Sequence, residues 1–295
     1  MIMLSSDRLR VEIAEPGEAP NDNRRFAHAG YVTEIVLDNK HRFGASEPHH
    51  LSHPSSGGRG LCCEYLFDLS GEAKVGEYYP KVGIGLLKKP DDEPYRIYRR
   101  YEMKPFPIHY TKTDSKAVFT VEPIPCMGYA FKHEKTVSVE GNAVTISERI
   151  ENVGEKRFVG REYCHNMLTI DGLAIGPAYQ MRLPDLTSRG KGLITGTIRG
   201  DGHGLTFTEY NHDPAFFAMD SADVTSKGSF KWVMRNTDAS PDPEGAVSVE
   251  CVEYMDACNL LFWAVDHLMS FEVHQEIDIA PGESKEWKRV WTFNA

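Results

Sequence analysis

Positive charge is scarce in this chain, in which 33 lysines and arginines stand against 43 aspartates and glutamates, for a formal net charge of −10. Proteins that hold nucleic acid or anionic membrane surfaces carry basic patches, because the phosphate groups of these partners attract Lys and Arg. The composition therefore excludes nucleic acid and membrane surfaces from the expected partners. A neutral or polar small molecule fits better.

Long hydrophobic runs are also missing. No segment approaches the roughly 18 consecutive apolar residues that a membrane-spanning helix needs. The N-terminal segment from Met1 to Arg8 becomes charged before the apolar core of a secretory signal could form. These absences predict a cytoplasmic protein, which we expect to be a monomer or a homodimer.

Two kinds of functional motif are absent as well. The six cysteines contain no C-x-x-C pair, and the adjacent Cys62 and Cys63 are a poor start for a disulfide framework, so reduced thiols are expected. Glycines occur at positions 57, 58 and 60, yet neither glycine pattern that cradles phosphate groups is present. Nucleotide binding is therefore disfavoured.

Amphipathic helices are the last absence, because no window keeps apolar residues at i, i+3, i+4 and i+7 over three turns. Short alternating runs bounded by turn residues are present instead, and they predict an all-β fold, a single large antiparallel sandwich over residues 1–295. The expected strands are 8–13, 31–37, 81–87, 117–121, 130–139, 144–150, 161–168, 247–255, 260–265, 269–279 and 287–293.

The segment 161–168 carries an unusual polar row. Strand side chains alternate between the two faces of a sheet, so Arg161, Tyr163 and His165 would all point the same way. A polar row inside a sheet indicates a wet groove. Glu162 would point to the opposite face, which favours a structural role.

A second strand supplies a possible partner for His165. In 269–279 the odd positions are apolar and the even positions polar, except for polar Gln275, so Glu272 and His274 leave the same face. A carboxylate and an imidazole in one groove would provide the base and the acid that proton transfer at both ends of a substrate requires. They are 272 − 165 = 107 residues apart, and the sequence alone does not show that they meet.

The polar loop over 46–60 contains three histidines. A metal site is one interpretation, but their spacing matches no established ligand pattern, so we expect neither a metal nor a cofactor. It is more plausible that one of them, taken as His53, reaches over a binding cleft with Arg59 and Glu64.

Several of these segments together resemble the galactose mutarotase-like (aldose 1-epimerase) superfamily. They are the Arg-Glu-Tyr-Cys-His-Asn run at 161–166, the Gly-Gly-Arg-Gly-Leu-Cys loop at 57–62, the segment 81–87, and Phe271-Glu272 followed by Pro281-Gly282-Glu283. The resemblance extends from about residue 25 to the C-terminus. It implies a β-supersandwich of the galactose mutarotase type, with a sugar cleft on its concave face and a small carbohydrate as partner.

The resemblance also implies roles. His165 would donate a proton to the ring oxygen of a free sugar, and Glu272 would take one from its anomeric hydroxyl, with no metal or redox cofactor. The family's Asn-Arg pair, which binds sugar hydroxyls, corresponds to Asn23-Arg24. The expected substrate contacts are therefore Arg24, His53, Arg59, Glu64, Arg161, Tyr163 and His274. The order His165-Asn166-Met167 departs from the usual motif and marks a divergent member.

Three alternatives remain open on the same fold. One is a carbohydrate-binding protein without catalytic activity. Another is an enzyme similar to polysaccharide lyases, with Tyr163 as base and Arg161 as the group that neutralises charge. The third is a glycosidase, which needs a pair of catalytic carboxylates; Glu162 points away from His165, so no such pair is evident near that segment.

Overall fold

Strands make up almost all of the secondary structure. The computed structural model describes residues 1–18, 22–47, 56–184, 193–200, 203–219, 226–242 and 245–295. Within these residues the chain forms 23 strands and one 3₁₀ helix, η1 (Ser70–Glu72). Every strand pairing is antiparallel. The predicted all-β antiparallel fold is confirmed.

Ten strands form the first sheet, in the order β1-β2-β3-β5-β13-β22-β21-β18-β15, with β4 paired to β3. Its central strands β5, β13 and β22 come from distant parts of the chain, so the middle of this sheet is built by long-range pairing. The bounds are Ile2–Ser5 (β1), Leu9–Ala14 (β2), Tyr31–Leu37 (β3), His41–Arg42 (β4), Gly60–Leu66 (β5), Phe158–Met167 (β13), Leu193–Ile194 (β15), Ala215–Met219 (β18), Asn259–Ala264 (β21) and Met269–Ile279 (β22).

Ten further strands form the second sheet, in the order β16-β17-β14-β19-β20-β23-β12-β11-β10-β9. Their bounds are Ile108–Lys112 (β9), Lys116–Val121 (β10), Phe131–Glu140 (β11), Ala143–Asn152 (β12), Tyr179–Arg182 (β14), Ile198–Gly200 (β16), Gly204–Phe207 (β17), Phe230–Asn236 (β19), Val247–Tyr254 (β20) and Ser284–Asn294 (β23). A small third sheet joins Tyr78–Lys81 (β6), Gly85–Lys88 (β7) and Met103–Pro105 (β8).

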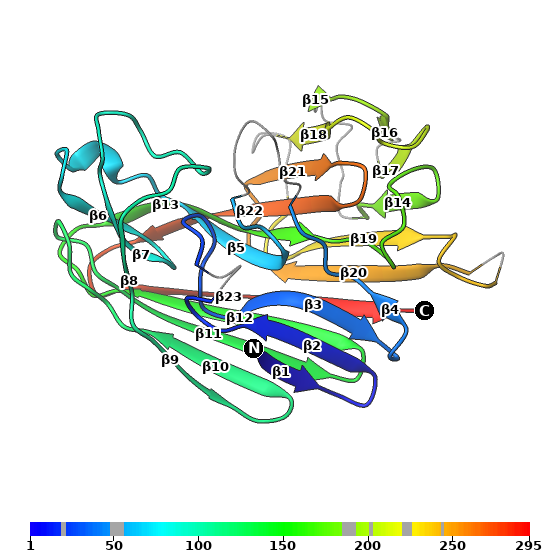
Figure 1. The fold of residues 1–295 in the computed structure, drawn as a ribbon, viewed down its shortest axis with the longest axis horizontal. Coiled ribbons are helices and arrows are strands. Elements are labelled where there is room, and N and C mark those ends of the chain that lie inside the picture. Colours follow the sequence, from blue (N-terminus) through cyan, green and yellow to red (C-terminus); the bar gives the residue numbers. More distant parts are fainter. Residues whose placement is uncertain (19–21, 48–55, 185–192, 201–202, 220–225, 243–244) are drawn as a thin grey trace.

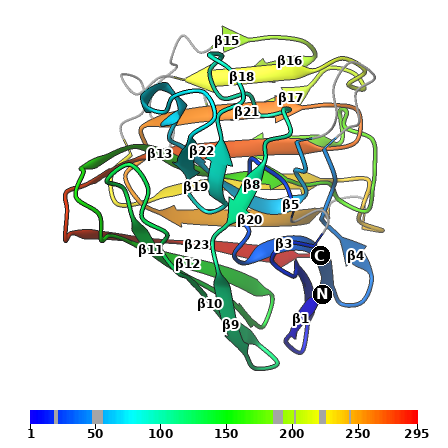
Figure 2. The ribbon, with the colours of Figure 1, turned by 60° about the vertical axis from the view of Figure 1, so that its left-hand side comes forward.

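The two large sheets lie face to face, with β6 to β8 at one end (Figures 1 and 2). Their inner faces share one hydrophobic cluster, to which Val11 and Phe271 contribute from the first sheet and Phe119 and Trp291 from the second. Alternation explains this arrangement, because strands such as β11 bury every second residue. Removing this apolar surface from water is the main favourable term in folding.

One predicted strand is wrong. The segment 81–87 is not continuous, because β6 ends at Lys81 and β7 begins at Gly85. The residues between them form a turn. Gly83 has a φ of +78°, a backbone conformation that residues with a side chain rarely adopt. The prediction that small residues allow a close approach holds at Gly85, where an added Cβ would lie 2.2 Å from the carbonyl oxygen of Lys104.

Candidate active site

His165 and Glu272 lie side by side at the centre of the first sheet. Residues 158–162 of β13 pair with residues 279–275 of β22, and the bridge between Leu168 and Met269 has the same offset. This offset sets His165 opposite Glu272. His165 Nδ1 lies 2.9 Å from Glu272 Oε1, and both side chains are buried. The fold therefore brings together the two residues that are far apart in the sequence.

Hydrogen bonds indicate which ring nitrogen of His165 carries the proton. Arg25 Nη2 lies 3.2 Å from His165 Nε2, and a guanidinium can only donate. His165 Nε2 therefore accepts, which leaves the proton of a neutral imidazole on Nδ1. Nδ1 faces Ser270 Oγ at 2.7 Å as well as Glu272, and Ser270 donates to Glu272 Oε1 over 3.2 Å. These three side chains form one hydrogen-bonded unit.

Glu272 is held in its ionised form. Burial alone would raise the pKa of this carboxyl group, but His165 and then His274 outweigh it and lower the pKa to about 2. Oε1 is occupied by His165 and Ser270, whereas Oε2 lies 3.5 Å from His274 Nε2. Glu272 thus keeps one oxygen that no neighbour in the described part of the chain holds at short range.

A second carboxylate anchors Arg25. The Arg25 Nε donates to Glu64 Oε2 over 2.7 Å and Nη2 donates to the Tyr163 hydroxyl over 3.2 Å, while Tyr163 itself donates to Glu64. Burial, followed by Glu64, raises the pKa of Tyr163 well above its usual value. Burial would also raise the pKa of Glu64, but Arg25 and Lys81 leave it lowered. Glu64 is therefore an anion, and Tyr163 keeps its proton.

His274 is the member of the site whose ring nitrogens lack hydrogen-bond partners among the described residues. Its ring stacks on Tyr163, with ring centroids 4.3 Å apart and an interplanar angle of 8°. The residue is only 7% exposed, and neither ring nitrogen completes a hydrogen bond with the described residues. A buried polar group without a partner costs about 1–3 kcal/mol. His274 thus has unused hydrogen-bonding capacity at the edge of the pocket that it lines. We call Arg25, Glu64, Tyr163, His165, Glu272 and His274 the site cluster.

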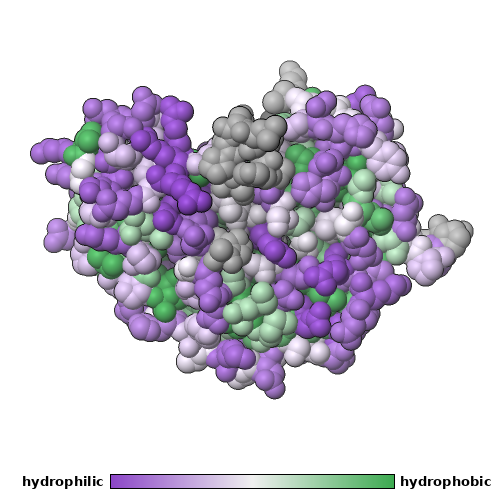
Figure 3. Space-filling model, viewed as in Figure 1, coloured by the Kyte–Doolittle hydropathy of each residue, from purple (hydrophilic) through white to green (hydrophobic). Residues whose placement is uncertain are grey.

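A pocket of about 400 Å³ is lined by every member of the site cluster except Glu64, which reaches it only through Arg25 and Tyr163. Its polar half is lined by Arg25, Glu47, Tyr98, Tyr163, His165, Glu272 and His274. Its apolar half is lined by Ile97, Met167, Pro214, Phe216, Leu261 and Trp263. In the space-filling view, hydrophilic residues cover most of this side of the molecule, with smaller hydrophobic areas between them (Figure 3). The lining therefore combines a polar set with an apolar set, and Leu261, Trp263 and Phe216 of the apolar set come from the neighbouring strands β21 and β18.

Two of the other residues proposed from the sequence lie away from this pocket. The Arg59 Nε donates to the carbonyl of Thr33 over 3.2 Å. Arg161 shares the face of Tyr163, as the alternation predicts, but it lies opposite Glu276, one pair further along the strand. Neither arginine is among the residues that line the pocket.

The neighbouring arginines at positions 24 and 25 diverge. The Arg24 Nε donates to the carbonyl of Tyr101 over 3.1 Å, and Arg24 does not line the pocket, whereas Arg25 does. This segment is not a strand, so no alternation distinguished the two arginines in the sequence. His53 lies outside the described residues.

The apolar half was also missed by sequence reasoning. Strand β21 reads Asn-Leu-Leu-Phe-Trp-Ala, and only its burial pattern separates the core residues Leu260 and Phe262 from Leu261 and Trp263 on the pocket face. A run that is apolar on both faces gives no periodic signal.

A second set of buried charges lies between the two sheets, and we call Lys135, Glu148, Glu162, Glu253 and Arg289 the interior cluster. Arg289 donates to Glu162 over 2.8 and 2.9 Å and to Glu253 over 2.7 Å. Lys135 Nζ lies 3.6 Å from Glu148. Glu162 therefore has the structural position that its alternation indicated.

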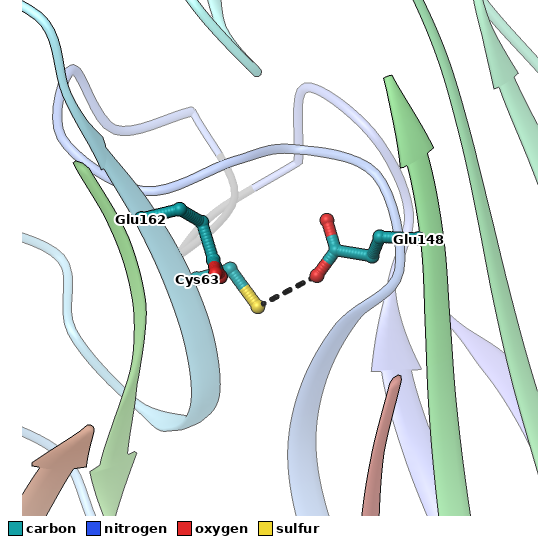
Figure 4. A group of neighbouring side chains, drawn as sticks. All are labelled: Cys63, Glu148 and Glu162. Atoms are coloured by element: carbon teal, nitrogen blue, oxygen red, sulfur yellow. Dashed lines mark hydrogen bonds between the residues drawn. The ribbon is translucent and has the colours of Figure 1, made fainter. Parts of the chain in front are cut away.

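Figure 4 shows Cys63, Glu148 and Glu162, whose ligand atoms lie within 4.8 Å of one another and could hold a metal ion. Cations of the protein already neutralise this group, since Arg289 binds Glu162 and Lys135 Nζ lies 3.1 Å from Cys63 Sγ. The donor set therefore fits an internal ion network better than a metal site. All six cysteines are free thiols.

Comparison with known proteins places the fold. No family model matches the chain, and no curated protein does. Solved structures do match: a galactose mutarotase-like protein from Lactobacillus casei is 13% identical, with all of both chains covered and a TM-score of 0.59. A putative aldose 1-epimerase from Escherichia coli K12 is 11% identical, with 99% and 98% of the two chains covered and a TM-score of 0.55.

The Slr1438 protein from Synechocystis is similar to the same degree, at 13% identity over 99% of this chain and 95% of that protein, with a TM-score of 0.58. These likenesses show that the chain has the galactose mutarotase-like fold, so the resemblance inferred from the sequence is confirmed at the level of the fold. In the described part of the chain, no helix is long and apolar enough to cross a membrane.

Proposed function

We propose that this protein is an aldose 1-epimerase, which interconverts the α and β anomers of a free sugar. The observation that carries the proposal is the pairing of His165 with Glu272, 2.9 Å apart, at a pocket in the middle of the first sheet. A general acid and a general base on one wall can act on the two oxygens that flank the anomeric carbon. The similar fold of aldose 1-epimerase-like structures supports this reading.

In the proposed reaction, Glu272 Oε2 takes the proton of the anomeric hydroxyl, and the imidazolium of His165 gives a proton to the ring oxygen. The bond between C1 and the ring oxygen breaks, and an open-chain aldehyde forms. Rotation about the C1–C2 bond presents the other face of the aldehyde, and ring closure returns both protons. Glu272 is able to take this proton because it is ionised before the sugar binds.

Arg25 has to change partners during this cycle. In the structure its Nη2 faces His165 Nε2, where a second imidazole proton would have to sit. Sugar hydroxyls in the polar half offer Arg25 alternative acceptors, so binding of the sugar would free Nε2. Tyr163, Glu64 and His274 are proposed to position the sugar and Arg25, and His53 stays a proposed contact. Arg24, Arg59 and Arg161 do not line the pocket, and we propose no contact of theirs with the sugar.

A carbohydrate-binding protein without activity is the second candidate, and the contact between Arg25 and His165 favours it. If the guanidinium stays on Nε2, His165 cannot act as an acid. The lyase alternative is less favoured, because Tyr163 keeps its proton and Arg161 does not line the pocket. The glycosidase alternative would require Glu47 to act with Glu272 as the second catalytic carboxylate. Glu47 instead accepts hydrogen bonds from the backbone and the hydroxyl of Ser56.

We also propose that the protein works in the cytoplasm, with a small free carbohydrate as its partner and without a cofactor. The six free thiols fit a reducing compartment.

The test is an NMR measurement of anomer exchange across a panel of aldoses, with wild-type protein and His165→Ala. We expect accelerated exchange with at least one sugar, and its loss in His165→Ala. Binding of a sugar without acceleration by the wild type would replace the epimerase with the binding protein. Full exchange by His165→Ala would contradict the assigned acid.

A further inference from the structure

Ser270 touches both proposed catalytic groups but does not line the pocket. Its Oγ lies 2.7 Å from His165 Nδ1 and 3.2 Å from Glu272 Oε1, and the residue is 0% exposed. Trp263, which lies opposite Ser270 on β21, does line the pocket. Residues two apart on a strand leave the same face, so Ser270 and Glu272 share the face of the sheet that carries the site. Ser270 is therefore placed to act on the catalytic groups rather than on a sugar.

The direction of these hydrogen bonds follows from the contact with Arg25. Arg25 donates to His165 Nε2, so the neutral ring carries its proton on Nδ1. The hydroxyl of Ser270 must then accept from Nδ1, and its own proton goes to Glu272 Oε1. A hydroxyl group has one proton and two lone pairs, so one serine serves both partners. A hydrogen-bond chain thus runs from His165 through Ser270 to Glu272.

The proposed reaction uses the other nitrogen of the His165 ring. Nε2 gives a proton to the ring oxygen of the sugar and takes it back when the sugar ring closes, so Nε2 needs a lone pair at the open-chain stage. A proton held on Nδ1 keeps that lone pair on Nε2. In the structure Arg25 enforces the same tautomer, but the proposed reaction requires Arg25 to leave Nε2. The partners of Nδ1 then decide the tautomer.

Glu272 alone would hold Nδ1 less firmly at the open-chain stage. Its Oε1 lies 2.9 Å from His165 Nδ1, but Glu272 has by then taken the anomeric proton and is neutral. Hydrogen bonds to an ionised acceptor are roughly twice as strong as hydrogen bonds between neutral groups. The hydroxyl of Ser270 keeps the same charge throughout the cycle. Its bond to Nδ1 therefore persists while the bond between Nδ1 and Glu272 weakens.

We infer that Ser270 is a positioning residue for this reaction. It keeps the proton of His165 on Nδ1 and holds Glu272 by Oε1, so that Nε2 and Oε2 are the atoms that exchange protons with the sugar. Ser270 itself neither gains nor loses a proton over the cycle. The inference rests on the proposed function, because it gives Ser270 a part in that reaction.

The experiment measures anomer exchange by wild-type protein and Ser270→Ala, with an aldose that the wild type equilibrates. Ser270→Ala should lower kcat about 10- to 100-fold, because a loosely placed catalytic group costs up to about 100-fold in rate. KM should stay within about twofold, since Ser270 does not line the pocket. Wild-type kcat in Ser270→Ala overturns the inference, and so does a loss confined to KM.

Ser6→Ala is the matched control. The hydroxyl of Ser6 donates to the carbonyl of Gly141 and accepts from the amide of Leu9, and Ser6 does not line the pocket. Both variants lose one hydrogen-bonded hydroxyl, so both should lose a small part of their stability. Only Ser270→Ala should lose kcat. An equal loss of kcat in Ser6→Ala would show that the loss follows stability, which overturns the inference.

Nitrogen NMR of the His165 ring tests the tautomer itself, which a purely structural role of Ser270 would leave unchanged. Glu272→Gln puts a neutral group in place of the carboxylate, as at the open-chain stage. With sugar bound and at about pH 8, above the ordinary histidine pKa of about 6.5, the ring should carry its proton on Nδ1 in Glu272→Gln. In the double variant with Ser270→Ala, the proton should be shared between both nitrogens. The same tautomer in both proteins overturns the inference.

The outcomes separate this inference from the proposed function. If the wild type accelerates exchange and Ser270→Ala matches it, the inference fails and the epimerase proposal stands. If the wild type accelerates the exchange of no sugar, the epimerase proposal fails. The inference then fails with it, because Ser270 has no proton transfer to support.

Discussion

The site cluster and the interior cluster both bury several charges, yet they differ in access to the pocket at the centre of the first sheet. Five of the six members of the site cluster line this pocket, whereas no member of the interior cluster does, and only Glu148 among them borders a different pocket, on the second sheet. Each contains an arginine clamped by glutamate: Arg25 by Glu64, and Arg289 by Glu162. In the interior cluster, Arg289 and Lys135 lie against carboxylates between the sheets. In the site cluster, Glu272 Oε2 has no neighbour at short range, and neither nitrogen of His274 completes a hydrogen bond with the residues that the structure describes.

Buried charge alone therefore does not identify a site. What distinguishes the site cluster is access to the pocket combined with polar atoms that the protein leaves unsatisfied. The two clusters also share strand β13, whose odd residues Tyr163 and His165 face the pocket while Glu162 faces the interior. A slip of one residue in this strand would exchange the two sets, because side chains alternate.

The largest effect is expected when the interior cluster loses its shared cation. Arg289→Met removes the partner of Glu162 and Glu253 and leaves two buried carboxylates uncompensated. We expect the free energy of unfolding to fall by about 3–5 kcal/mol in denaturant titrations. Arg149→Met, which removes an exposed ion pair on β12, is the control and should lose much less. Equal losses in the two variants would contradict the distinction between the clusters.

A pH series tests the charge of Glu272. Its pKa is about 2 in the folded protein and near 4.5 ordinarily, so the carboxylate stabilises the fold above about pH 4.5, and this contribution is lost as the pH falls toward 2. Between pH 7 and pH 3, wild-type protein should lose about 2 kcal/mol more stability than Glu272→Gln. Parallel pH profiles for the two proteins would show that Glu272 is not held as an anion.

A smaller effect is expected for the hydroxyl that links Arg25 to Glu64. Tyr163→Phe removes this hydroxyl and keeps the ring that stacks on His274. Its loss should cost about 1.5 kcal/mol of stability, because both hydrogen-bond partners are charged. It should also slow anomer exchange, since Arg25 is less firmly placed. Tyr254→Phe, on the exposed face of the second sheet, is the control. An equally large loss of stability in Tyr254→Phe would show that the hydroxyl of Tyr163 has no special role.

The smallest effect is expected for Arg161, which shares the face of Tyr163 but does not line the pocket. Arg161→Gln should change the exchange rate by less than about twofold, because substitutions on the surface and away from a site usually change free energies by no more than about 0.5 kcal/mol. The measurement is the same NMR exchange assay. A tenfold loss would return Arg161 to the sugar-binding residues and extend the polar half along β13.

The alternation of polar and apolar residues along strands is the basis of much that could be predicted from the sequence. It located β22 with the bounds Met269–Ile279 and placed His165, Tyr163 and Glu272 on the correct faces, because half-buried strands have a strict period of two. It did not reveal the pairing of β13 with β22, since contacts between distant strands leave no local signal. It also missed Arg25, which lies outside any strand. The single-domain organisation and the roles of the site residues stay predictions.

Anomer exchange by Glu272→Gln and Glu276→Gln tests whether Glu272 is the base that takes the proton of the anomeric hydroxyl. Both glutamates leave the same face of β22, but Glu276 is exposed and does not line the pocket, whereas Glu272 is buried beside His165. With an aldose that the wild type equilibrates, Glu272→Gln should be about 100- to 10,000-fold slower, and Glu276→Gln should match the wild type. Anomer exchange at the wild-type rate by Glu272→Gln would contradict the role of Glu272 as the base.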